Sequence, residues 1–389
     1  MVDEEPPRRT GRAQLAERLR GALSPVVSPL AAFGGRLARL QLGKWVRPAL
    51  GLLVLGFVAW RLWLVLGAAE GAYGADTWVR LAISGIILGS VYAVIALGYT
   101  LVYGILFMIN FAHGDVMMLG SFTGFFTLTA LNASGFMNRS PVTAIASIVC
   151  AFLVGMLSAM AVAVVLERIA YRPLRTAPRL VPLISAIGAS LFLENAAQLM
   201  FGAARQSFPN PAILERNSGW QLMIEGKEVL ITYTGVLTLV LSFLLMGGLY
   251  ALVQRTKMGK AMRAVAEDKK TAALMGIDVD RIIRNTFAIS GLLAGAAGVM
   301  WGLHMGIIYP YVGFIPGIKA FTAAVMGGIG SVPGAMLGGL TLGVLESVGP
   351  GALGIPYQLK DVVAFSILVL VLIFRPTGLL GEVLAQKKA

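Results

Sequence analysis

The side chains that could carry out chemistry in this sequence are few, and they stand inside long apolar runs. Glu194, with Gln198 four residues further on, lies in the run from 181 to 202, and Glu346 lies near the end of another run. A bare carboxylate in lipid is costly, so we expect each glutamate to be protonated, paired or in contact with water. For Glu194 we favour a contact between helices over a substrate site, because Glu194 and Gln198 share a helix face.

A second polar group is the sequence NFAHGD, from Asn110 to Asp115, between two apolar runs. Asn110 and Asp115 could simply cap and turn a pair of helices, which is a common use of these residue types. Alternatively, the turn borders a translocation pathway, as ionisable groups inside membranes often do. The two interpretations are compatible, and the sequence leaves both open.

Active sites of the soluble type find no support in the sequence. The histidines are His113 and His304 and the single cysteine is Cys150, which argues against a histidine-built metal centre and excludes a disulfide framework. The motifs GxxxxGK[ST], HExxH and GxSxG are absent from the sequence. We therefore expect a protein that is not an enzyme and binds no cofactor itself, and an enzyme embedded in the membrane is the least favoured alternative.

Composition indicates that membrane helices position these polar groups. Of the 389 residues, 57% are hydrophobic and only 13% are charged, which does not fit an ordinary soluble domain. The net charge of +13 could suggest nucleic acid, but the basic residues cluster between apolar runs, as positive-inside bias predicts. The 47 glycines suit close packing of helices in lipid. We predict an all-α polytopic membrane protein that binds no nucleic acid.

Two segments precede the main group of predicted spans. Residues 1–47 carry nine Lys and Arg against four acids and are predicted to form a basic cytoplasmic tail. A signal peptide would have a shorter charged region and a small-residue cleavage site, so residues 48–67 are predicted to be a retained, extra transmembrane helix. Further apolar spans follow at about 79–103, 109–131, 142–166, 181–202, 231–253, 286–308 and 358–375.

The charges between the spans give a consistent orientation. With the tail inside, segment 167–180 falls inside and holds four arginines against one glutamate. Segment 203–230 falls outside and is balanced in charge, and segment 255–285 falls inside with eight basic residues against four acids. This agreement with the positive-inside rule supports the predicted alternation.

The run from Ile318 to Gly349 is longer than one span needs, and the sequence GGIGSVPGAMLGG interrupts it around Pro333. A single crossing would leave the C-terminal basic residues outside. We therefore predict a re-entrant or broken-helix hairpin of two half-helices that enters and leaves on the outer side, in addition to about eight full spans. Irregular backbone at membrane depth is tolerated only where protein or a water-filled cavity covers it. The hairpin should therefore line the interior or a pathway.

The segment from Thr256 to Asn285 is the longest charged block between two spans. Its first half is rich in helix-forming residues, Gly276 breaks the pattern, and Asp278 and Asp280 can cap a new helix. We predict two helices joined at a glycine on the cytoplasmic side, and such a block usually faces a partner.

These features coincide in one family. The run SGIILGSVYAVIALGYTLVYGILFMINFAHGDVMMLGSF (Ser84 to Phe122) resembles the opening of the H-type permease subunits of bacterial branched-chain amino acid ABC importers, the Liv permeases. Further similar stretches are GKAMRAVAEDKKTAALMGID (Gly259 to Asp278), AVMGGIGSVPGAMLGG (Ala324 to Gly339) and FRPTGLLG (Phe374 to Gly381). The resemblance covers about residues 79–381, which would form the permease transmembrane domain, and leaves residues 1–75 as an addition.

The resemblance implies a subunit of a larger complex in the bacterial inner membrane. Family members pair with a second, M-type permease, bind two cytoplasmic ATPase subunits and receive substrate from a periplasmic binding protein. ATP and Mg²⁺ would then be held by the partner ATPases, which fits the lack of a phosphate-binding loop here. The resemblance places the ATPase-coupling loop at 254–285, with contacts from Ala264, Ala266, Glu267, Ala272, Ala273 and Gly276. For the translocation pathway the candidates are Asn110, His113, Asp115, Gly328, Gly330 and Ser331.

The resemblance identifies the family but leaves more than one substrate open. Urea and short-chain amide importers use related permeases with a similar NxAHG stretch, and some relatives serve other amino acids. The stretch NFAHGD favours the amino-acid importers of the family over the urea and amide importers. A rival of another class is a stand-alone secondary transporter driven by an ion gradient, with Glu194 or Glu346 as its coupling carboxylate.

Overall fold

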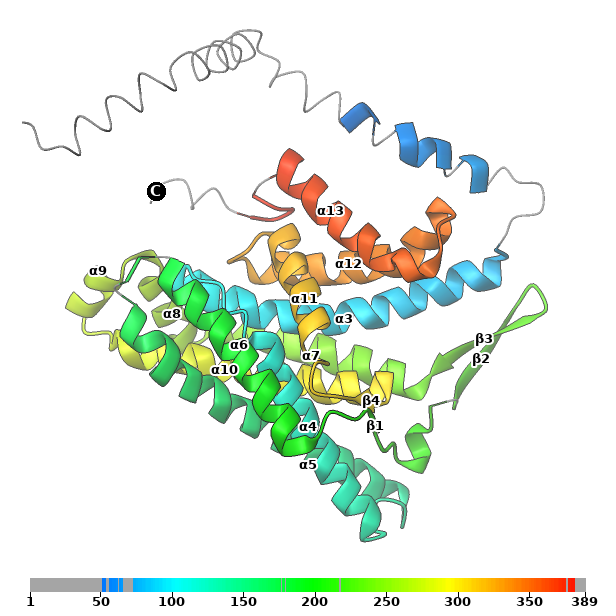
Figure 1. Ribbon diagram of the computed structural model, residues 1–389, viewed down its shortest axis with the longest axis horizontal. Helices are drawn as coiled ribbons and strands as arrows, with labels where there is room; N and C mark the ends of the chain where they lie inside the picture. The colour runs from blue at the N-terminus through cyan, green and yellow to red at the C-terminus, as the bar shows by residue number, and fades with distance from the viewer. Residues whose placement is uncertain are drawn as a thin grey trace, which may run out of the picture. The chain divides into compact units, whose positions relative to one another are not determined.

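The computed structural model describes residues 51–53, 56–61, 63–65, 73–175, 177–178, 180–216, 218–375 and 377–381 (Figure 1). The predicted tail 1–47 lies outside the described residues. The predicted extra helix 48–67 is described only in part, as helical pieces within Gly51–Val65.

Eight helices in the described part of the chain are long and apolar enough to cross a membrane. This confirms the prediction of an all-α polytopic membrane protein. The eight are α3 (Ala75–Leu106), α4 (His113–Ala133), α5 (Pro141–Leu166), α6 (Leu180–Phe201), α7 (Tyr233–Arg255), α10 (Val279–Met305), α12 (Val332–Leu353) and α13 (Lys360–Phe374). Helix α5 continues through the short η1 (Glu167–Tyr171) and η2 (Arg172–Leu174), and η4 (Tyr357–Leu359) precedes α13.

The remaining elements lie between these spans. Helices α8 (Lys257–Glu267) and α9 (Lys269–Leu274) precede α10, the shorter apolar helix α11 (Phe314–Gly327) follows it, and η3 (Ala212–Leu214) is a single turn. Strands β2 (Gly219–Ile224) and β3 (Lys227–Thr232) form an antiparallel hairpin, and β1 (Gln206–Ser207) pairs with β4 (Ile307–Ile308). The β2–β3 hairpin lies at one end of the long helices, and α8 and α9 lie at the other (Figure 1).

Helix α3 is the central helix of the bundle. It packs on α12, α10, α11 and α7, and its second half is almost entirely buried. The contact with α12 is antiparallel and close: a Cβ built at Gly85 would lie 2.8 Å from Val344 Cα, and one at Gly89 would lie 2.9 Å from Leu340 Cα. Small residues allow helix backbones to approach in this way, which is how helices associate in lipid.

A second close contact joins α4, α5 and α10. A Cβ at Gly295 of α10 would lie 2.7 Å from Met156 Cα, and one at Gly291 would lie 2.8 Å from Met160 Cα. At Gly298 the neighbour is the first half of α4, where the Ser121 amide nitrogen would be 2.8 Å away. The glycines of α10 therefore serve helix packing, as the sequence suggested.

The predicted hairpin exists, but its two arms are unequal. Helix α11 has 14 residues and α12 has 22, enough for α12 to count as a full span. The expectation of two half-helices split around Pro333 was therefore wrong for the second arm. Pro333 lies in the first turn of α12, where its missing N–H costs no hydrogen bond, so it does not interrupt the helix.

The break itself is the turn Gly328–Ser331, in which Gly328 and Gly330 have φ of 109° and 96°. Its neighbours place it at the end of the bundle where α3 finishes. Gly104 of α3 adjoins Gly330, and the amide groups of Leu379 and Leu380 donate to the carbonyl groups of Met326 and Gly327. With the positive-inside orientation, the chain enters α11 from the outer side, the turn lies towards the cytoplasmic end, and α12 leads back to the outer side.

Candidate functional site

Helix α4 begins inside the bundle rather than at its edge. In its first turn, the His113 ring packs edge-on against Tyr99 of α3 with ring centroids 4.8 Å apart. His113 Nδ1 lies 3.3 Å from Oγ of Ser290, near the middle of α10, and a Cβ at Gly98 would collide with the ring. The predicted pathway residue His113 is thus fully buried between α3 and α10, away from the cavity described below.

Asn110 has a structural contact. Its Oδ1 accepts a 2.5 Å hydrogen bond from the hydroxyl group of Tyr171 in η1, and its carbonyl group accepts one from the His113 amide. Its side chain does not cap α4, which has no side-chain cap. Asn110 therefore ties the irregular turn to the end of α5.

The two carboxyl oxygens of Asp115 differ in their hydrogen bonds. Ser190 of α6 donates a hydrogen bond to Oδ2, whereas the buried Oδ1 has no hydrogen-bond partner among the described residues. The carboxyl group of Glu194, one turn further along α6, adjoins that of Asp115 and also keeps a buried oxygen without a partner. Gln198 instead accepts a 2.8 Å hydrogen bond from the hydroxyl group of Tyr311. Glu194 and Gln198 thus each join α6 to another element.

Asp115 borders a cavity of about 210 Å³. The cavity lies where the first turn of α4 meets the first turn of α11, with one wall from α6 and one from Tyr99. The two helix starts approach closely, because a Cβ at Gly317 would lie 3.0 Å from Gly114 Cα. Two helix starts therefore meet inside the bundle, and helix ends inside a bundle are where substrate sites of many transporters are built.

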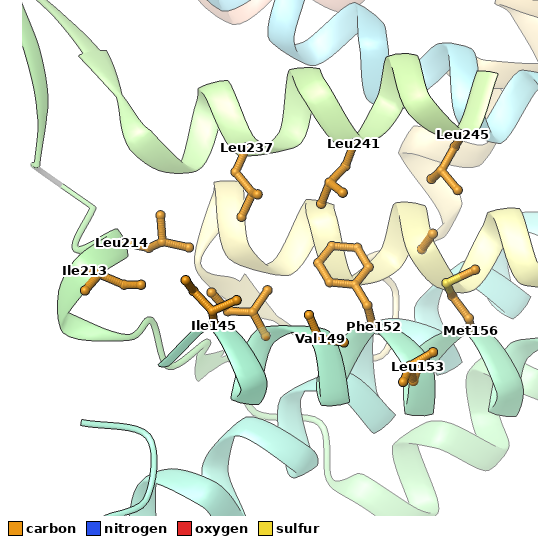
Figure 2. Close-up of a pocket in the computed structure, with 12 residues that line it drawn as sticks. Ile145, Val149, Phe152, Leu153, Met156, Ile213, Leu214, Leu237, Leu241 and Leu245 are labelled. Atoms are coloured by element: carbon orange, nitrogen blue, oxygen red, sulfur yellow. The ribbon is translucent and has the colours of Figure 1, made fainter. Parts of the chain in front are cut away.

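A larger groove of about 320 Å³ has no polar lining (Figure 2). Figure 2 shows Leu237, Leu241 and Leu245 of α7 opposite Phe152 and Met156 of α5. The groove suits apolar groups such as lipid chains and offers nothing to a charged ligand. The smaller cavity beside Asp115 is the better candidate for a polar pathway.

The other predicted pathway residues lie in the turn between α11 and α12. Ser331 caps α12, with its Oγ accepting a 3.2 Å hydrogen bond from the Gly334 amide, and Gly328 packs against the C-terminal Gly381. Gly328, Gly330 and Ser331 do not border the Asp115 cavity. Of the six candidates, only Asp115 lines it.

A buried cluster of ion pairs was not predicted from the sequence. Lys319 of α11 lies 2.8 Å from Glu346 Oε1 and 2.5 Å from Asp361 Oδ1, and Lys360 Nζ lies 3.3 Å from Glu346 Oε1. Glu346 is completely buried and is paired, which is one of the three states expected for it. Lys319 is a charged residue inside the apolar run from which the hairpin was predicted. This exception to the apolar pattern could have revealed the ion cluster.

The predicted coupling loop forms two short helices. Thr256 caps α8, Asp268 caps α9 and Asp278 caps α10, each through a side-chain oxygen that accepts from a backbone amide. Gly276 ends α9 with φ of 82°, a conformation that favours glycine. The predicted break at Gly276 is therefore present, but the two short helices are joined at Asp268, and the helix that follows Gly276 is the span α10.

Exposure divides the six predicted coupling residues. Ala272 is buried and Ala264 and Ala266 are half-buried against the core, so these alanines mainly pack the block in place. Exposed members of the set are Glu267, Ala273 and Gly276. The prediction omitted the two most exposed apolar side chains here, Leu274 at 87% and Met275 at 78% exposure.

Ion pairs fasten the block to the neighbouring helices. Arg175 contacts Glu167 and lies 2.5 Å from Asp280 Oδ1 at the start of α10, and Arg172 also contacts Asp280. Burial, with the nearby charge of Arg175, lowers the pKa of Lys269 in α9 below its usual range. The start of α9, the end of α5 and the start of α10 thus lie together.

A family model described as branched-chain amino acid transport system / permease component matches residues 81–372, which is most of the chain. The chain belongs to this family. The match confirms the resemblance seen in the sequence, and it assigns α3 to α13 to the permease. No solved structure matches the permease.

Curated relatives align with most of this chain. It is 47% identical over 311 residues to the high-affinity branched-chain amino acid transport system permease protein BraD of Pseudomonas aeruginosa, covering 80% of this chain and 98% of BraD. It is 44% identical over 305 residues to the LivH protein of Escherichia coli, covering 78% and 96% of the two chains. The xylose transport system permease protein XylH of Escherichia coli is 32% identical over 174 residues, 42% of this chain and 44% of XylH.

Proposed function

We propose that this permease, with a second M-type permease subunit, forms a pathway that moves branched-chain amino acids inward across the bacterial inner membrane. The names of BraD and LivH, at 44–47% identity over nearly their whole length, support the substrate class. The polar cavity at the meeting point of α4 and α11 supports the position of the pathway, since one of its walls is a carboxylate and the others are largely apolar.

The energy is proposed to come from two cytoplasmic ATPase subunits that hold ATP and Mg²⁺, while a periplasmic binding protein delivers the substrate. The observation that carries this proposal is the pair Leu274 and Met275, exposed at the end of a charged block. Large apolar side chains at such a position are typical of a protein contact. Movement of an attached ATPase would pass through α8 and α9 to α10, α7 and α3, on which the block packs.

The alternative from another class of transporter is a stand-alone protein driven by an ion gradient. Such a transporter would need a buried carboxylate that is free to bind the coupling ion. Glu346 is held by Lys319 and Lys360 and is therefore not a free coupling group. Glu194 beside Asp115 is the group that would have to act as the coupling carboxylate. An importer of urea or short-chain amides is the alternative within the same class.

Reconstitution of the complex tests these proposals. The permease is co-expressed with a second, M-type permease and two ATPases and is placed in proteoliposomes with a periplasmic binding protein. Uptake of radiolabelled leucine is then measured with ATP, without ATP and with urea as competitor. We expect leucine uptake that requires ATP and all subunits. Leucine movement by this chain alone under a proton or sodium gradient would refute the proposal, and competition by urea but not by isoleucine would reassign the substrate.

A further inference from the structure

We propose, as a refinement that rests on the proposed function, that the cavity between Asp115 and the start of α11 is a transit subsite for a zwitterionic α-amino acid. In this subsite Asp115, with Glu194 beside it, receives the ammonium group. The first turn of α11 faces the carboxylate, and apolar residues of α6 and α11 contact the branched side chain.

Two buried carboxyl groups lie side by side at the cavity. Asp115 is 1% exposed, and beside the Ser190 hydroxyl its carboxyl group adjoins that of Glu194, which is also buried. Leaving a buried carboxylate oxygen unpaired costs a large part of its desolvation free energy. No lysine or arginine among the described residues forms an ion pair with Asp115 or Glu194, unlike Glu346 with its two lysines. A cationic ligand in the cavity would compensate the charge of this carboxyl pair.

The start of α11 borders the same cavity. Helix α11 has 14 residues and no side-chain cap at Gly313, and Gly313 lines the cavity together with the first-turn residues Phe314 and Gly317. An uncapped helix N-terminus carries a partial positive charge and favours an anionic group. The cavity is therefore bordered by a negative side chain and by a positive helix end, which matches the charges of a zwitterion.

Apolar residues form another part of the cavity lining. Ile187 and Leu191 of α6 and Ile318 of α11 are apolar and border the same cavity. They provide a surface for an aliphatic side chain, whereas the groove of Figure 2 lacks any group for the charged end of the molecule. Ser190 holds the other Asp115 oxygen, so the carboxylate is fixed in position before a ligand arrives.

The test uses the full complex in proteoliposomes and measures leucine moved per ATP hydrolysed. Asp115→Asn should lower this ratio about tenfold or more, because a hydrogen bond to a charged group is lost, while assembly and ATP hydrolysis persist. Asp115→Glu should retain most transport. The matched control is Asp76→Asn, which alters a buried carboxylate at the outer end of α3 that pairs with Lys227 and lies outside the cavity.

A second variant keeps the test decisive if Asp115→Asn fails to assemble. Leu191 borders the cavity but is 54% exposed, so Leu191→Trp can fold, and it should block uptake at intact ATP hydrolysis. Leu199→Trp, two turns along α6 and outside the cavity, should transport normally. Normal transport by Asp115→Asn or Leu191→Trp would overturn the subsite alone, whereas a wild-type complex that moves no leucine would overturn the proposed function.

Discussion

The ammonium group of Lys319 lies 2.8 Å from Glu346 Oε1, although both side chains belong to apolar helices and are at most 4% exposed. This pair joins the two arms of the broken hairpin, and Asp361 and Lys360 extend it to α13. A buried pair is costly to form, but breaking it by removing one partner is more costly, because the other charge is left uncompensated.

Lys319→Met should therefore destabilise the permease by about 3 kcal/mol. Thermal unfolding in detergent, followed by the loss of monodisperse protein, gives the measurement. The double variant Lys319→Met/Glu346→Gln should recover part of the loss, since it removes the unpaired charge. A single variant as stable as the wild type would show that the cluster contributes nothing to holding the hairpin.

The exposed tip of the cytoplasmic block gives the second prediction. Leu274→Asp should abolish co-purification of the ATPase subunits and ATP-driven uptake, because it puts a charge into the apolar part of the proposed contact. Membrane insertion and unfolding temperature should not change, since Leu274 is 87% exposed. Leu222→Asp, in the β2–β3 hairpin at the other end of the bundle, is the matched control and should retain the ATPases. Equal retention by both variants would contradict the coupling role.

Gly295 gives a prediction about packing. Gly295→Ala should destabilise the bundle by about 1–3 kcal/mol, because the new methyl group would meet the backbone of α5, which cannot move aside locally. Gly248→Ala in α7 is the control, since a Cβ there meets nothing within 4 Å. That change should be neutral or stabilising by up to about 1 kcal/mol. Similar unfolding temperatures for the two variants would argue against a close contact between α5 and α10.

Much of this fold could be predicted because membrane spans and their orientation depend on local sequence, namely on runs of apolar residues and on the charges between them. The glycine turn at Gly276 and the cap at Asp278 were predicted from the same kind of local signal. The convergence of Asp115, Ser190 and Glu194 could not be predicted, because it depends on how α4 and α6 pack. The partner of Glu346 was missed for the same reason, since Lys319 lies on a different helix.

The hairpin turn gives a last prediction, about depth in the membrane. The two half-helices expected from the sequence would have ended near the middle of the bilayer, but the turn at Ser331 adjoins the end of α3 and the C-terminal residues 379–380 pair with the end of α11. In a Cys150→Ser background, Ser331→Cys should therefore react with a membrane-impermeant maleimide added to inside-out vesicles. It should not react in intact spheroplasts, whereas Leu222→Cys in the β2–β3 hairpin should show the reverse. Labelling of Ser331→Cys from the outer face only would show that α11 and α12 have the opposite orientation. The block at 256–285 would then not lie on the cytoplasmic side.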